Sequence, residues 1–140
     1  MEIELINERC KPKRAYKTDA GLDCYLNIKD TIMVKPHDVK VLPLGFKIDL
    51  KKGNAGIIKA RSSIFQKGIN IDGLIDSSYR GEVGVMIQNT TEKPHYFKPF
   101  DRICQLVPVR INTSSIEVVD KLNDTKRGEG GFGSTGRQYG

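Results

Sequence analysis

The sequence contains no tryptophan, only two histidines and only four alanines among its 140 residues. Helical folds rely on alanine, leucine and straight-chain polar residues, so the scarcity of alanine argues against a helical protein. The 15 isoleucines and 9 valines favour half-buried strands instead. A chain of this length is long enough for one domain with its own core and too short for two ordinary ones. We therefore expect a single all-β domain.

Cysteine and histidine are too few and too dispersed to form a structural framework. Cys10, Cys24 and Cys104 are odd in number, and His37 and His95 are isolated. No disulfide framework or zinc site is expected, and a reducing compartment is the simpler interpretation: the cytoplasm, or the host cell cytoplasm for a viral protein. No apolar run approaches the length of a membrane span and no apolar signal segment begins the chain, so no membrane association is expected.

Positive charge is in excess, with 23 lysines and arginines against 17 acidic residues. This balance suits an anionic partner such as a nucleotide or nucleic acid, although a solvated basic surface explains it equally well. A barrel that binds single-stranded nucleic acid needs aromatic and basic residues interleaved on its strands, and the aromatics here are scattered. Direct nucleic-acid binding is therefore not expected, and such a binding module is kept as an alternative from another class.

Alternation of apolar and polar residues predicts short strands along most of the chain. The even-numbered residues from 42 to 50 are apolar, whereas the preceding apolar residues, Val39 and Val41, are odd-numbered. This change of phase predicts a bulge or bend near Pro43. Residues 83–87 alternate in the same way. Between 103 and 109, odd- and even-numbered residues are both largely apolar, which predicts a strand buried on both faces. Shorter candidates are 3–5, 22–26, 32–34 and 116–119, with turn sequences at 35–38, 52–54 and 98–101. Many short strands with regular turns favour a sandwich or barrel.

Two segments lack this alternation of apolar and polar residues. Residues 62–68 predict one short helical turn, with serines able to cap its start and Gly68 able to end it. Residues 127–140 hold six of the 14 glycines and only one large apolar residue, Phe132. Because no core can be built from such a segment, we expect a flexible arm.

Two segments also carry groups suited to phosphate. Arg61, followed by Ser62 and Ser63 at the expected helix start, offers a guanidinium, two hydroxyls and backbone N–H groups. Taken alone, these residues are explained better by a helix cap beside a surface arginine. In the arm, glycines let the backbone fold closely over an anion, and Arg127 supplies charge. The spacing of a P-loop is absent. An aromatic ring on such an arm can close over a flat base.

Acidic and aromatic residues near strand ends are candidates for chemistry. Asp76 follows two apolar residues and precedes a turn, which suits a carboxylate kept ionised as a base, although an Asx-turn explains it equally well. Tyr79 is either a core ring or an aromatic platform with a polar tip. Asp23, at the start of an expected strand, is a candidate to face a metal.

Taken in order, five segments form a recognisable set. They are 20–23 (AGLD), 60–63 (ARSS), 73–82 (GLIDSSYRGE), 101–106 (DRICQL) and 127–136 (RGEGGFGSTG). Their order and spacing resemble the five motifs of the trimeric dUTP diphosphatases (dUTPases), from about residue 12 to residue 136. The sequence departs from the family pattern at Ala60, where proline is frequent, and at Phe100, where glycine is usual.

The resemblance implies a jelly-roll-like β-barrel with one short helical turn in residues 1–125 and a flexible arm in 126–140 that closes over the active site. It also implies a homotrimer with active sites between subunits. The implied reaction is Mg²⁺-dependent hydrolysis of dUTP to dUMP and pyrophosphate by attack of water on the α-phosphorus. This reaction supplies dUMP for thymidylate synthesis and keeps uracil out of DNA. A dCTP deaminase, which shares the barrel and the trimer, is the alternative within the superfamily.

The resemblance also implies residue roles. Asp76 matches the catalytic aspartate that orients and activates the attacking water, and Asp23 matches an acid that approaches Mg²⁺ through coordinated water. Asn70 matches a position that reads the uracil edge in some members, and a narrow hairpin over 69–74 would exclude the methyl group of thymine. Tyr79 matches the ring that packs under the deoxyribose. The other implied substrate contacts are Arg61, Ser62, Ser63, Gly73, Gln105, Arg127, Phe132 (stacked over uracil), Gly133, Ser134 and Thr135.

Overall fold

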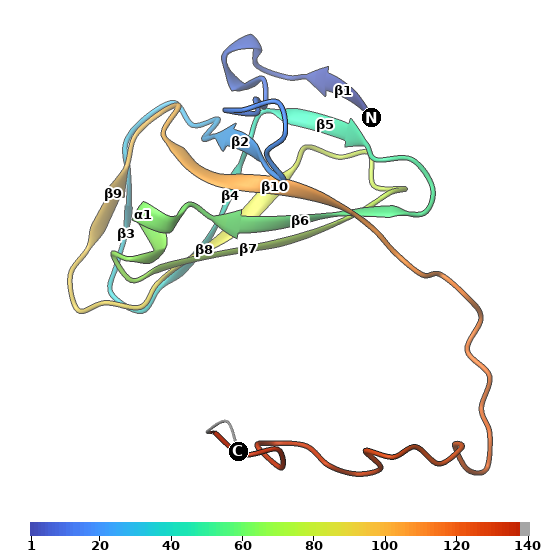
Figure 1. The fold of residues 1–140 in the computed structure, drawn as a ribbon. Coiled ribbons are helices and arrows are strands. Elements are labelled where there is room, and N and C mark those ends of the chain that lie inside the picture. The colour runs from blue at the N-terminus through green and yellow to red at the C-terminus, as the bar shows by residue number, and fades with distance from the viewer. Residues whose placement is uncertain (138–140) are drawn as a thin grey trace.

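The computed structural model describes residues 1–137, and its secondary structure confirms the predicted all-β class with one short helical turn. The described residues contain ten strands, joined mostly by short turns (Figure 1). The strands are β1 (Glu2–Leu5), β2 (Leu22–Tyr25), β3 (Ile32–Val34), β4 (Val39–Pro43), β5 (Phe46–Asp49), β6 (Asn54–Ala60), β7 (Ile69–Asp76), β8 (Gly84–Asn89), β9 (His95–Phe97) and β10 (Arg102–Arg110). A 3₁₀ helix, η1 (Glu8–Cys10), and a short helix, α1 (Ser62–Phe65), complete the fold.

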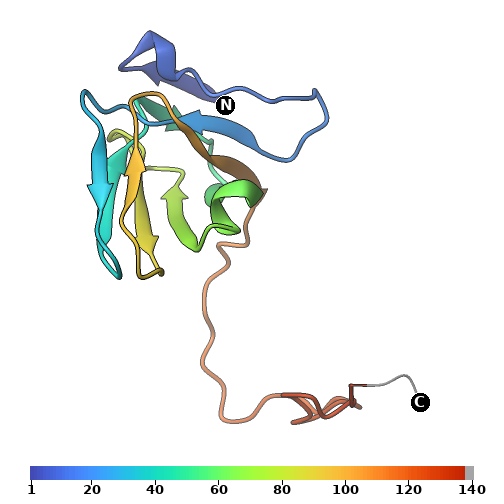
Figure 2. The same cartoon turned by 90° about the vertical axis from the view of Figure 1, so that its left-hand side faces the viewer.

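The strands form three antiparallel sheets. The largest has the order β2-β10-β6-β7-β8-β4, and the pairs β1-β5 and β3-β9 form two smaller sheets. The sheets curl around one interior (Figure 2), as the predicted jelly-roll-like barrel requires. Segments far apart in the chain, such as β2 and β10, are therefore direct neighbours.

The core consists of large aliphatic and aromatic side chains from these sheets. The prediction that the even-numbered residues from 42 to 50 face the core is confirmed, because all five are at most 5% exposed. Those members are Leu42, Leu44, Phe46, Ile48 and Leu50. Full burial of one such side chain stabilises the fold by about 1.5–3 kcal/mol, so this single segment anchors β4 and β5 to the core.

The predicted phase slip near Pro43 is wrong. The buried parity continues unchanged from β4 into β5, and Val39 and Val41 simply face outward, with 51% and 71% of their surfaces exposed. The chain instead bends at Gly45, whose φ of 78° is unfavourable for other residues. A Cβ atom there would also lie 2.6 Å from the Cβ atom of Cys10, so glycine lets η1 pack against this bend.

Two strands of the large sheet differ from the prediction. β6 was not anticipated, because adjacent Ile57 and Ile58 hide its alternation. The hairpin expected over 69–74 is wrong: β7 is one continuous strand, paired with β8 through Ile69–Asp72 and with β6 through Asp72–Asp76. Even-numbered residues of β7 therefore face outward in a single row. β9 was likewise missed, since three residues are too few for a periodic signal.

The strand predicted over 103–109 is confirmed as β10, but its predicted burial on both faces is wrong, because Val107 and Val109 are only half-buried. Consecutive residues Ile103 and Cys104 are both buried because the pairing with β2 shifts register between Arg102 and Cys104. The strand predicted at 116–119 is wrong for the single chain, where these residues are exposed and in no strand.

After β10 the chain runs away from the sheets (Figures 1 and 2). Residues 111–137 form no strand or helix. Residues 138–140 of the expected arm lie outside the described residues. Within residues 1–137, no helix is both long enough and apolar enough to cross a membrane.

Candidate active site

Asp76 and Tyr79 lie together at the end of β7. Alternation along β7 directs the Asp76 side chain outward, and a turn follows in which the Tyr79 N–H donates to the carbonyl of Asp76 at 3.1 Å. A cavity of about 340 Å³ borders both side chains. It is lined by Val41, Leu74, Ile75, Asp76, Tyr79, Glu82 and Gly84. Asp76 and Tyr79, a carboxylate and an aromatic residue, therefore border one cavity.

The Tyr79 ring is folded back over its own turn. Its hydroxyl donates to the carbonyl of Glu82 at 2.9 Å, and the residue remains 45% exposed. A Cβ atom on Gly81 would lie 2.6 Å from Cζ of the ring, so only glycine leaves room for this packing. The Tyr79 ring is thus packed against Gly81 and partly open to solvent.

The far end of this turn is tied to the N-terminal part of the chain by Glu82. Its Oε1 accepts from the Asn27 amide and from the Gly45 N–H, both at 2.9 Å. Asn27 in turn accepts from the amide of Asn7 at 3.1 Å. No local sequence pattern predicts this network, because bonded partners in it lie up to 55 residues apart along the chain.

Helix α1 carries the candidate phosphate contacts. The predicted serine cap is wrong: Arg61 occupies the N-cap position, and no side chain caps the helix. Ser62 and Ser63 lie in the first turn with exposed side chains, where backbone N–H groups have no intrahelical acceptor. The Arg61 guanidinium donates to the carbonyl of Arg102 at 3.3 Å. Gly68, at φ 82°, ends this region as predicted.

Asp23 and Gln105 are directly opposite each other on β2 and β10. The same row continues through Lys59 on β6, so these three side chains share one face of the large sheet. Asp23 also pairs with Arg102, at 3.3 Å between Nη1 and Oδ2, and its side chain is 18% exposed. The predicted metal-facing acid thus lies next to a predicted phosphate contact.

The position of Asp23 fits a Mg²⁺ ion that the protein contacts through coordinated water. Within residues 1–137, no three side chains of His, Cys, Asp or Glu gather as a metal cage. Asp23 offers a single carboxylate, which suits an ion held mainly by phosphate oxygens and water.

Asn70 and Gly73 lie on β7 but face different ways. The Asn70 side chain is exposed opposite Gln88, and at about 3.3 Å per residue it lies roughly 20 Å along the strand from Asp76. It lines a separate cavity with Ser62. Gly73 faces inward, where a Cβ atom would lie 3.0 Å from Cγ1 of Ile58, so this glycine lets β6 and β7 pack closely.

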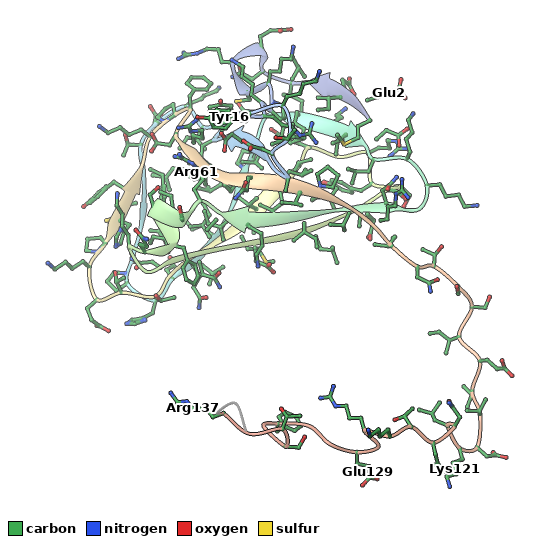
Figure 3. All side chains as sticks on the ribbon, viewed as in Figure 1. Glu2, Tyr16, Arg61, Lys121, Glu129 and Arg137 are labelled. Carbon is green, nitrogen blue, oxygen red and sulfur yellow. The ribbon has the colours of Figure 1, made fainter. Side chains whose placement is uncertain are left out.

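The arm residues remain apart from the other candidates. Figure 3 shows Glu129 and Arg137 well separated from Arg61. The Arg127 guanidinium donates to the carbonyl of Gly130 at 2.7 Å, and Phe132 is fully exposed. The remaining arm candidates, Gly133, Ser134 and Thr135, are exposed as well. One chain therefore divides the predicted residues among separate places instead of assembling them into one site.

Comparison with solved structures defines the class of fold. The dUTPase of Staphylococcus bacteriophage 80alpha, solved with dUpNHpp, superposes with a TM-score of 0.89 at 26% identity, covering 97% of this chain and 98% of that chain. A dUTPase from phage phi11 of S. aureus, in which a structural Mg(II) ion is coordinated, superposes with a TM-score of 0.79 at 23% identity, covering 88% and 98%. The fold is thus the jelly-roll of these phage enzymes.

Sequence comparison identifies the family. A family model described as dUTPase matches residues 8–136. The deoxyuridine 5'-triphosphate nucleotidohydrolase of Orientia tsutsugamushi (strain Ikeda) is 39% identical over 128 residues, covering 87% of this chain and 86% of that protein. The protein of the same name from Alcanivorax borkumensis is 40% identical over 134 residues, covering 91% and 89%. The chain belongs to the dUTPase family.

Proposed function

We propose that the protein hydrolyses dUTP to dUMP and pyrophosphate, with Asp76 as the catalytic residue. The observation that carries the proposal is the exposed Asp76 carboxylate beside the Tyr79 ring in one cavity of a dUTPase-family fold. The carboxylate orients water and accepts its proton as the water oxygen bonds to the α-phosphorus. The bond from that phosphorus to the bridging oxygen breaks, and pyrophosphate leaves. Positioning and charge neutralisation supply most of the acceleration in such a reaction.

The triphosphate would be bound by the groups around α1 and β10. Arg61, Ser62 and Ser63 offer donors at the start of α1, and Gln105 lies on β10. Mg²⁺, when bound, neutralises charge on the phosphates. Asp23 would hold it through water, since its carboxylate faces the same side of the sheet as Gln105.

Recognition of deoxyuridine would rest on Tyr79 and Asn70. The partly exposed Tyr79 ring would pack under the deoxyribose, where a ribose 2′-hydroxyl would clash. The Asn70 amide can satisfy the donor and acceptors of uracil, and buried polar groups left unpaired by another base make discrimination large. Phe132 of the arm would stack over the base, and Arg127, Ser134 and Thr135 would contact the γ-phosphate.

The active form would be a homotrimer with sites between chains. The outer face of the large sheet exposes Val39, Val41, Leu74 and Met86, and Val41 lies directly opposite Met86. Such an apolar face is typical of a protein interface. Asp76 and Asn70 of one chain border separate cavities, so groups from a neighbouring chain are needed to complete a site. The cytoplasm would suit the three free, buried thiols.

A direct assay tests the activity. Each deoxynucleoside triphosphate and UTP is supplied with Mg²⁺, and pyrophosphate is measured; turnover of dUTP should exceed that of dTTP, dCTP and UTP. Equal turnover of all four would contradict the specificity, and ammonia released from dCTP would favour a deaminase. Asp76→Asn should abolish turnover while the nucleotide still binds, and retained turnover would remove Asp76 from its role.

A further inference from the structure

Arg80 lies next to Tyr79 and bonds to the turn that follows Asp76. Its Nη1 donates to the carbonyl of Ser77 at 2.7 Å and to the carbonyl of Tyr79 at 3.1 Å. A planar, permanently charged guanidinium is suited to bridging two acceptors in this way. The side chain thus holds together the backbone between the carboxylate and the ring of the cavity described above.

Arg80 is itself held by a different sheet. Its Nη2 lies 3.4 Å from Oδ1 of Asp49, the last residue of β5. The Asp49 carboxylate also accepts from Lys51, from the backbone N–H at 2.9 Å and from Nζ at 3.1 Å. Lys51 Nζ in turn pairs with Glu2 of β1, labelled in Figure 3. A chain of polar contacts therefore connects the β1-β5 sheet to the turn.

The side chains of Glu2, Asp49 and Lys51 stabilise one another in their charged forms. Hydrogen bonds from the backbone and side chain of Lys51 keep the pKa of Asp49 below its ordinary value, and the charge of Arg80 contributes. The hydrogen bond and charge of Lys51 likewise lower the pKa of Glu2. Carboxylates on both sides raise the pKa of Lys51. The contacts that orient Asp49 toward Arg80 are therefore complete at neutral pH.

The turn has few other constraints. Ser78, Tyr79 and Arg80 are exposed, so hydrophobic burial does little to fix their positions. Besides Arg80, two hydrogen bonds of Tyr79 close the turn, from its N–H to the carbonyl of Asp76 and from its hydroxyl to the carbonyl of Glu82. The far end of the turn is fixed by the Glu82 carboxylate, bonded to Asn27 and Gly45, and by the buried Val83 that follows it. At the near end, Arg80 links the turn to the end of β5.

We propose that Arg80, held in place by Asp49, is a positioning residue for hydrolysis, because it fixes the turn that sets the Asp76 carboxylate and the Tyr79 ring. The inference rests on the proposed function. Displacement of a reacting group by about 1 Å can cost about 100-fold in rate. An exposed ion pair adds little stability. Loss of Arg80 should therefore lower the rate much more than the thermal stability.

The test compares Arg80→Gln, Arg80→Lys and Asp49→Asn with a matched control, Lys47→Gln. Lys47 pairs with Glu4 at 3.5 Å on the same two strands, and neither residue contacts the turn in the described chain. We expect Arg80→Gln to lower kcat about tenfold or more. Asp49→Asn should show a smaller loss, and Arg80→Lys should recover part of the rate because one charged donor remains. Lys47→Gln should stay within about twofold of the wild type.

A second measurement separates positioning from general weakening of the fold. The ratio of kcat/KM for dUTP to that for UTP should fall in Arg80→Gln and Asp49→Asn, because the Tyr79 ring moves, and should not change in Lys47→Gln. Wild-type kcat in both Arg80→Gln and Asp49→Asn, or equal losses in these variants and in Lys47→Gln, would overturn the inference. Turnover of dUTP by the wild type, measured first, tests the proposed function separately.

Discussion

Phe100 stands in a backbone conformation that normally favours glycine. Its φ is 64°, which costs a residue with a Cβ atom about 1–2 kcal/mol. The Arg9 guanidinium lies 3.8 Å from the centroid of its ring, a contact that contributes about 0.5–1 kcal/mol at an exposed site. The ring contact offsets about half of this strain, which helps to explain how phenylalanine is tolerated before the 101–106 segment.

Phe100→Gly should accordingly change the free energy of unfolding by less than about 1 kcal/mol, since strain and the ring contact disappear together. Arg9→Ala should destabilise the wild type by roughly 0.5–1 kcal/mol and the Phe100→Gly variant by less. Urea unfolding of the two single variants and the double variant measures this coupling. Equal costs of Arg9→Ala in both backgrounds would show that the ring contact contributes nothing.

Gly81 provides a second test at the level of one residue. Gly81→Ala should displace the Tyr79 ring and lower kcat/KM for dUTP about tenfold, with a smaller effect on UTP. In a Tyr79→Leu variant the ring is absent, so Gly81→Ala should cause little further loss of kcat/KM. Steady-state kinetics with both nucleotides measures the effect, and an additive loss in the double variant would contradict it.

At the scale of elements, regular alternation decided which strands could be predicted. β5 and β8 alternate strictly, with buried Phe46, Ile48, Val85 and Ile87, and their inward faces follow from the sequence. β6 could not be found in this way because Gly56 and paired isoleucines obscure its period. β7 alternates just as regularly, yet the family resemblance implied a hairpin over 69–74; pairing with β8 at one end and β6 at the other keeps β7 one continuous strand.

The pairing of β1 with β5 should depend on pH through Glu2, Asp49 and Lys51. The pKa values of both carboxylates are lowered in the fold from 4.5 and 3.8, so their stabilisation is present above those values and is lost as the pH falls through the lowered ones. The pKa of Lys51 is raised from 10.5, so its contribution persists until the pH rises beyond that value. Lys51→Met should therefore lower Tm slightly at pH 7 and by less near pH 3. An equal decrease in Tm at both pH values would contradict this origin.

At the scale of the whole molecule, the exposed apolar face should control assembly. Leu74 is 70% exposed in the single chain, so Leu74→Glu should leave the fold intact and prevent association. Light scattering should report a mass near three times 15.7 kDa for the wild type and near 15.7 kDa for the variant. Met33→Glu, on the separate β3-β9 sheet, is the control and should keep the wild-type mass. A wild-type monomer would contradict the proposed trimer.

The arm offers the other test at this scale. Residues 127–137 bury little surface within their own chain, so deletion of 127–140 should leave Tm and the oligomeric mass unchanged. Turnover of dUTP should nevertheless fall about 100-fold, because contacts to the base and the terminal phosphate are lost. Thermal melting, light scattering and kinetics on one preparation measure all three. An unfolded or dissociated product would show that the arm is structural.

The sequence by itself determined the all-β class, the burial of the even-numbered residues from 42 to 50 and the five segments that resemble the dUTPase motifs, because composition, periodicity and short motifs are local properties. Only the tertiary structure decided where those segments lie: Asp23 opposite Gln105, Asn70 in a cavity apart from Asp76, and Arg80 against Asp49. Register and contacts between sheets depend on the packing of distant segments around one core. No local pattern in the chain specifies that packing.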